Sequence, residues 1–135
     1  MERRLRLRAE ADFARIRSQG RSLGERRLTL LILPNGLEHN RYGIVVSKRV
    51  GKAVTRNVVK RRLREVLRRL DRDGAIPPGL DLALIVRPVA ATATFAELRE
   101  GVTALLQRAG VWRAVPAAPP PAPEAPPPPV RTERR

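Results

Sequence analysis

The sequence has no cysteine and only one histidine, His39. Without cysteine the chain can form no disulfide bond or thiolate metal site, and it has no cysteine nucleophile. His39 lies in the turn-like segment NGLEHN, where a lone histidine is expected to be solvated. Without a second histidine, the sequence indicates no zinc site.

Acidic residues are also scarce: 13 Asp and Glu face 28 Lys and Arg, which gives a formal net charge of +15. The carboxylates of Asp12, Glu65, Asp81 and Glu97 are scattered at no metal-ligand spacing. A nuclease that worked as protein alone would need clustered carboxylates or a histidine pair. We therefore predict no catalytic residue and no metal site in the protein, and an anionic partner that offsets its charge.

Long apolar runs are missing as well. No run approaches the ~18 apolar residues of a membrane-spanning helix. The opening stretch MERRLRLRAEADF lacks the apolar segment of a signal peptide. The aromatic residues are two Phe, one Tyr and one Trp, and the basic segment 52–69 contains none of them. A basic helix that bound a membrane surface would need such anchors. We expect a soluble, cytoplasmic protein that does not bind membranes.

Proline is concentrated at one end of the chain. The last twenty residues, PAAPPPAPEAPPPPVRTERR, contain nine of the 13 prolines. Proline donates no backbone hydrogen bond and favours extended, polyproline-like chain. We predict one folded domain over residues 1–113 and a Pro-rich disordered tail over 114–135, to which we assign no role.

The folded part alternates helical and strand patterns. Helical spacing of Ala9, Phe13 and Ile16 predicts a first helix that ends at Gly20. A capping box of Thr94 and Glu97 begins a last helix, which Gly110 ends. Strands are expected at 21–24, 26–33, 41–47 and 80–88, with a basic helix over 52–69. This order predicts a mixed α/β domain with helices packed on one small sheet.

The basic helix, KAVTRNVVKRRLREVLRR, has two distinct sides. At about 100° per residue, one side forms an apolar stripe. Its members are Val59, Leu63, Val66, Leu67 and Leu70. The opposite side carries polar and cationic residues, flanked by Arg56 and Lys60. They are Asn57, Arg61, Arg64 and Arg68.

The charge on this segment is almost all of one sign. Between Lys48 and Arg69 there are ten cations and one acid, Glu65. A solvated helix normally gains from opposite charges four residues apart, which this helix mostly lacks. An ordinary exposed face and a phosphate-binding face both remain open, and the shortage of acid favours phosphate binding. Asn57 could read an RNA sugar or base edge, or be a tolerated surface residue. VGKAV does not complete a nucleotide-binding loop, because Val46 and Ala53 stand where that pattern needs Gly and Ser or Thr.

The run RYGIVVSKRVGKAVTRNVVKRRLRE, from Arg41 to Glu65, resembles the bacterial ribonuclease P protein component. The telling parts are SK, then GKAV, then RN separated from GKAV only by Thr55, then KR and RE on the same helix. Upstream DFARIRSQGR and downstream GLDLALIVRP are similar to family elements in kind and order. The resemblance covers about residues 4 to 110.

This resemblance implies an α+β fold of the ribosomal-protein type. Such a fold has a small, mostly antiparallel four-stranded sheet with three helices. It also has an unusual left-handed crossover between the strand ending at Ser47 and that starting near Leu82. The implied partners are the catalytic RNA of ribonuclease P and precursor tRNA. That RNA, with magnesium bound mainly to the RNA, cleaves the precursor at the 5′ end of the mature tRNA.

The family's basic-helix motif implies RNA contacts, which we extend to nearby cations. The predicted RNA-binding residues are Lys48, Arg49, Lys52, Arg56, Asn57, Lys60, Arg61, Arg64 and Arg68. The family's cleft for the 5′ leader implies a role for Phe13 and Ile16, with Arg17 and Leu31 where relatives often have aromatics. Packing in the core remains an equal alternative for Phe13. Since stacking a base on an aromatic contributes ~1–3 kcal/mol, we expect leader binding to rely more on Arg17.

Two other kinds of nucleic-acid-binding protein would also account for the positive charge. A ribosomal or other structural RNA-binding protein remains the alternative, because fold type and charge would be the same. A DNA-binding module lacks an evident helix-turn-helix, so no DNA partner is expected.

Overall fold

The computed structural model describes residues 6–7 and 10–113. Ala9, predicted to lie in the first helix, and the predicted tail 114–135 lie outside the described residues. The helices are α1 (Glu10–Gln19), α2 (Ala53–Arg72) and α3 (Phe95–Ala109), with short 3-10 turns η2 (Lys48–Val50) and η3 (Pro88–Thr92). The strands are β1 (Arg21–Gly24), β2 (Leu28–Pro34), β3 (Arg41–Val46) and β4 (Leu80–Val86).

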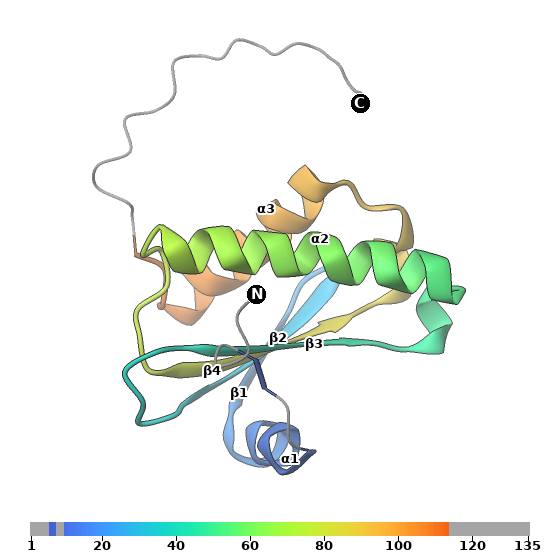
Figure 1. Cartoon of the computed structure of the whole chain (residues 1–135). Coiled ribbons are helices and arrows are strands. Elements are labelled where there is room, and N and C mark those ends of the chain that lie inside the picture. The colour runs from blue at the N-terminus through green and yellow to red at the C-terminus, as the bar shows by residue number, and fades with distance from the viewer. Residues whose placement is uncertain (1–5, 8–9, 114–135) are drawn as a thin grey trace, which may run out of the picture.

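The four strands form one sheet in the order β1-β2-β4-β3. The β1–β2 and β2–β4 pairs are antiparallel, while β3 and β4 run parallel. This confirms the expected mostly antiparallel sheet with three helices. The parallel pair requires a crossover, and α2 provides it over one face of the sheet (Figure 1). The left-handed sense of that crossover stays a prediction.

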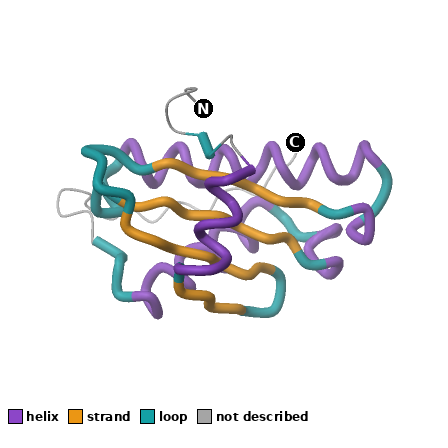
Figure 2. The backbone as a smooth tube through the Cα atoms, turned by 90° about the horizontal axis from the view of Figure 1, so that it is seen from below, coloured by secondary structure: helices purple, strands orange, loops and turns teal. Residues whose placement is uncertain are grey.

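The helices cover both faces of the sheet (Figures 1 and 2). Helices α2 and α3 lie on one face, and α1 lies across the strands on the other. Since side chains alternate along a strand, β2 and β4 serve both layers. Leu30 and Leu84 are buried in the main core under α2 and α3. Leu31, one position after Leu30, and Ala83, one position before Leu84, belong to a smaller cluster under α1.

The apolar stripe predicted for α2 is confirmed. Its buried residues are Val59, Leu63, Val66, Leu67 and Leu70. The helix extends three residues beyond the predicted end, to Arg72, and Gly74 then turns the chain with a φ of 73°. The stripe fixes the rotation of α2, so the cationic side necessarily faces away from the sheet.

The capping box predicted for α3 is also confirmed. Thr94 Oγ1 accepts a hydrogen bond from the Glu97 backbone N–H at 3.1 Å, and Glu97 Oε1 accepts one from the Thr94 N–H at 2.9 Å. Gly110 ends the helix in the left-handed conformation, with a φ of 78°. The hydrogen bond from the Thr94 backbone lowers the pKa of Glu97, because it stabilises the charged carboxylate.

Helix α1 is joined to the sheet both by a small apolar cluster and by a buried carboxylate on β4. Asp81 on β4 is completely buried. It accepts hydrogen bonds from Arg41 at 2.8 and 2.9 Å, from Arg15 on α1 at 2.8 Å, and from the Asn35 side chain at 2.9 Å. Fully buried Ile16 adds the main apolar anchor of the helix. The Asp81 cluster, defined as Asp81, Arg15, Arg41 and Asn35, therefore joins α1 to the sheet.

Candidate RNA interface

The outward side of α2 carries exposed cations that have no acidic partner among the described residues. Asn57, Arg61 and Arg64 are exposed and lie on the side opposite the buried stripe. Among the residues that the structure describes, neither Arg61 nor Arg64 forms an ion pair or a side-chain hydrogen bond. We call Arg61 and Arg64 the α2 ridge. Guanidinium groups in such a position are available to bind phosphate oxygens bidentately.

Further cations extend this surface at the start of α2. Lys48, Arg49 and Lys52 are exposed on η2 and the residue before the helix. Gly51 shapes the approach with a φ of 150°, which non-glycine residues rarely adopt. Its carbonyl accepts a hydrogen bond from Arg56 Nε at 3.1 Å. Arg56 is thus tied to the loop, whereas the three exposed cations are not.

Lys60 is half-buried and forms no ion pair within the part of the chain that is described. Arg68, by contrast, is already paired. Its guanidinium donates to both oxygens of Glu65, at 2.9 and 2.6 Å, and Arg69 Nε donates to Glu65 at 2.7 Å. These hydrogen bonds lower the pKa of Glu65 to about 2. Of the nine predicted RNA-binding residues, Arg68 is therefore the one whose charge is offset by an acid in the described part of the chain.

A cavity of about 510 Å³ lies beside the α2 ridge. It is lined by Arg6, Arg61, Arg62, Arg64, Glu65, Arg68, Arg69 and Phe95. Sequence reasoning missed Arg6, Arg62, Arg69 and Phe95. The Arg69 guanidinium carbon lies 4.9 Å from the centre of the Phe95 ring, a cation–π contact. Phe95 is the first residue of α3, and this position places it beside Arg69. No local pattern in the sequence indicates this contact.

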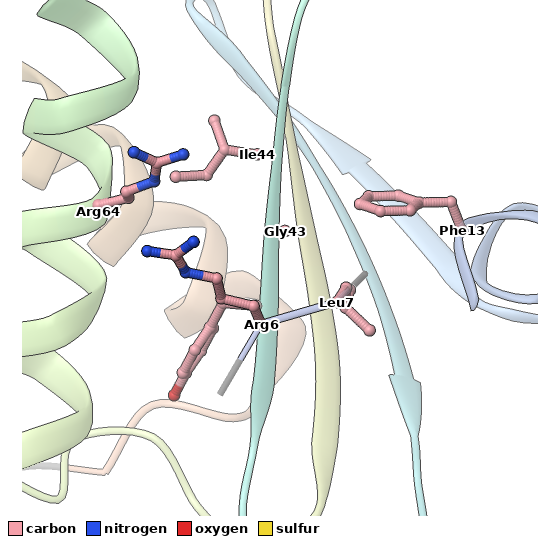
Figure 3. A pocket seen from close by; sticks show the side chains of 7 residues that line it. Arg6, Leu7, Phe13, Gly43, Ile44 and Arg64 are labelled. Atoms are coloured by element: carbon pink, nitrogen blue, oxygen red, sulfur yellow. The ribbon is translucent and has the colours of Figure 1, made fainter. Parts of the chain in front are cut away.

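Phe13, one of the predicted leader-cleft residues, lines a second cavity of about 330 Å³ (Figure 3). The other lining residues are Arg6, Leu7, Tyr42, Gly43, Ile44 and Arg64. Phe13 packs directly on the edge strand, because a Cβ at Gly43 would lie 2.5 Å from its Cζ. Phe13 therefore packs on the sheet and also faces a cavity.

The other three residues assigned to the leader cleft lie elsewhere. Ile16 is completely buried, and Leu31 is only 8% exposed. Both belong to the small core cluster under α1, so neither side chain is available to a leader strand. Helical spacing placed Ile16 correctly on the inner side of α1, and that same side packs on the sheet. Arg17 is exposed on α1 but does not line the cavity that contains Phe13.

Within residues 6–7 and 10–113, no group of three or more His, Asp or Glu side chains could hold a metal ion. Across the same residues, none of the helices is long and apolar enough to cross a membrane.

Comparisons with known proteins agree on one family. The Ribonuclease P family model matches residues 1–110. The chain belongs to the ribonuclease P protein family. It is 37% identical over 105 residues to the ribonuclease P protein component of Clostridioides difficile, covering 78% of this chain and 91% of the relative. It is 42% identical over 112 residues to that of Roseiflexus castenholzii, covering 82% and 90%.

Solved structures of this family share the fold. The Staphylococcus aureus ribonuclease P protein superposes with a TM-score of 0.73 at 32% identity, over 81% of this chain and 98% of that one. The Thermotoga maritima ribonuclease P protein gives a TM-score of 0.69 at 38% identity, over 76% and 96%. Both the sequence resemblance and the α+β fold are thus confirmed.

Proposed function

We propose that this chain is the protein subunit of ribonuclease P and that it binds the catalytic RNA through the α2 ridge and the cations before α2. In this role it promotes 5′ maturation of tRNA by an RNA-based endoribonuclease. Membership of the ribonuclease P family supports the subunit role. The observation that carries the RNA contact is the pair Arg61 and Arg64, exposed and without acidic partners in the described part of the chain.

The protein's part in this proposal is electrostatic. Each phosphate that the surface neutralises releases counterions, so affinity for the RNA subunit should fall steeply with salt. Magnesium and bond cleavage are assigned to the RNA. Cations near the RNA backbone would reduce the repulsion between phosphates and so help magnesium-dependent folding at low metal concentration.

The 5′ leader of precursor tRNA is assigned to the cavity beside Phe13. That cavity offers the Phe13 ring beside the largely buried Tyr42, the apolar Leu7 and Ile44, and two guanidinium groups, Arg6 and Arg64. This combination suits an unpaired nucleotide, which presents a base for stacking and a phosphate for ion pairing.

The test is reconstitution with the RNA subunit at low magnesium. The expected result is that the full-length protein restores cleavage of precursor tRNA, while the protein without RNA cleaves nothing. A protein that gives no stimulation but still binds ribosomal RNA would instead be a structural RNA-binding protein. Cleavage by the protein alone would contradict the assignment of bond cleavage to the RNA.

A further inference from the structure

Two arginines from distant parts of the sequence line both cavities of this surface. Arg6 and Arg64 border the cavity beside Phe13 and also the cavity beside Phe95. Figure 3 shows their guanidinium groups on the same side of β3, beside Ile44, with Phe13 and Leu7 on the other side. Both side chains are therefore shared by the two cavities, next to β3, the strand at the edge of the sheet.

Backbone pairing between the N-terminal segment and β3 explains why Arg6 lies beside these cavities. The Leu7 N–H donates to the Tyr42 carbonyl at 2.7 Å, and Arg6 forms a parallel bridge with Tyr42. Leu7 is only 6% exposed and packs in the cluster under α1. Since consecutive residues of extended chain point to opposite faces, burying Leu7 on the α1 side directs Arg6 to the α2 side. Arg64 reaches the same place from the exposed side of α2.

The charge balance at this point is unfavourable without an anion. Both arginines are exposed, and in the described residues neither has a carboxylate partner. Among the described residues, the only acid that lines either cavity is Glu65, whose oxygens already accept hydrogen bonds from Arg68 and Arg69. Two guanidinium groups that converge without an acid repel each other, and an anion between them would remove that repulsion. A phosphate, with oxygens for two bidentate donors, is the anion that this geometry suits best.

We propose that Arg6 and Arg64 form a clamp for one phosphate of the precursor tRNA leader, at the point where the leader strand rounds the edge of β3. This rests on the proposed function and adds a residue outside the basic helix to it. A free phosphate would not need the apolar wall beside the clamp. A nucleotide strand uses both parts, because its base can lie against Phe13 while its phosphate meets the arginines.

The test uses preassembled holoenzyme at saturating protein, so that weaker assembly does not confuse the result. Affinity is measured for precursor tRNA and for mature tRNA over a series of salt concentrations. Arg6→Ala should weaken precursor binding by about three- to tenfold, leave mature tRNA unaffected, and reduce the salt slope by about 0.7. Arg6→Lys should recover only part of the loss, because Lys lacks the planar fork. Arg99→Ala, a cation on α3 that lines neither cavity, is the matched control and should change nothing.

A double-mutant cycle tests whether the two arginines share one phosphate. If they do, Arg6→Ala combined with Arg64→Ala should lose less precursor affinity than the product of the single losses. Replacing single leader phosphates with neutral methylphosphonates locates the contact. At one position the replacement should weaken precursor binding by the wild-type holoenzyme. At that same position it should cause no further weakening in the Arg6→Ala holoenzyme.

Independent, multiplicative losses would overturn the clamp, as would equal weakening of precursor and mature tRNA by Arg6→Ala. Weaker binding of the RNA subunit by Arg6→Ala, with an unchanged precursor-to-mature ratio, would assign Arg6 to the catalytic RNA and overturn the leader assignment. Failure of the proposed function looks different, because then the wild-type protein itself would give no stimulation of cleavage.

Discussion

The Asp81 cluster and the α2 ridge both consist largely of arginine, yet they do opposite things. In the cluster, Arg15 and Arg41 converge on one fully buried carboxylate. The hydrogen bond with Asp81 raises the pKa of Arg41 despite its partial desolvation. On the ridge, Arg61 and Arg64 have no such partner among the described residues. Arg15 and Arg41 stabilise the fold because they pair with a buried acid. Arg61 and Arg64 have no such acid beside them in the described part of the chain, so they remain available to bind a ligand.

The largest expected effect comes from disrupting the Asp81 cluster. Asp81→Ala leaves the partly buried Arg15 and Arg41 without their carboxylate, and it should lower the free energy of unfolding by about 2–4 kcal/mol. Urea denaturation measures this loss. Asp73→Ala, which removes an exposed acid after α2, is the control and should stay within about 0.5 kcal/mol of wild type. Equal effects of the two substitutions would mean that the buried cluster does not hold α1.

The next effect concerns the packing between α1 and the edge strand. Gly43→Ala places a methyl group 2.5 Å from the Phe13 ring, so the ring or the strand must move. We expect a loss of about 1–3 kcal/mol in unfolding free energy together with weaker leader binding. The double variant Gly43→Ala/Phe13→Ala should recover stability relative to the sum of the single losses, because it removes the clash. Full additivity of the two losses would contradict the contact.

A smaller effect tests Glu65, the acid on α2 that pairs with Arg68 and Arg69. The Arg68 and Arg69 hydrogen bonds lower the pKa of Glu65 from 4.5 to about 2. Its folded pKa lies below the unfolded value, so its ion pairs stabilise the protein above about pH 4.5. That contribution is lost as the pH falls towards about 2. Carboxyl NMR titration should place the Glu65 midpoint near 2, and a midpoint near 4.5 would mean that the pairs do not persist in solution.

The companion variant Glu65→Gln frees Arg68 and Arg69. It should therefore strengthen binding of the RNA subunit and steepen its salt dependence slightly. An unchanged salt dependence would indicate that neither arginine faces RNA.

The smallest expected effect is that of Arg17→Ala. Arg17 was the sequence-based choice for leader binding, but it lies outside the cavity that contains Phe13. The precursor-to-mature affinity ratio should change far less than with Arg6→Ala. A larger loss with Arg17→Ala would move the leader path onto the outer side of α1.

The elements that could be predicted from sequence are those whose signals are local. The buried stripe of α2 and the capping box of Thr94 and Glu97 repeat or close within a few residues, so periodicity and spacing reveal them. The Asp81 cluster could not be found this way, because Arg15, Arg41 and Asp81 meet only through the parallel pairing of β3 with β4 and the packing of α1.

The cavity beside Phe13 shows the same limit. The sequence offered Phe13 for the leader cleft, but its contact with Gly43 and the position of Arg6 depend on how the N-terminal segment and α1 pack on β3. Ile16 lies buried in the small cluster under α1, because helical spacing identifies the inner side of a helix and cannot say whether that side meets a sheet or an open cleft.

The most direct test of the unpaired ridge is the salt dependence of RNA-subunit binding. The dissociation constant is measured across a potassium chloride series for wild type, Arg61→Ala, Arg64→Ala and the control Arg99→Ala. Each ridge substitution should weaken binding and reduce the salt slope by about one, with stability unchanged, while Arg99→Ala behaves as wild type. Wild-type affinity and slope in both ridge variants would contradict the account.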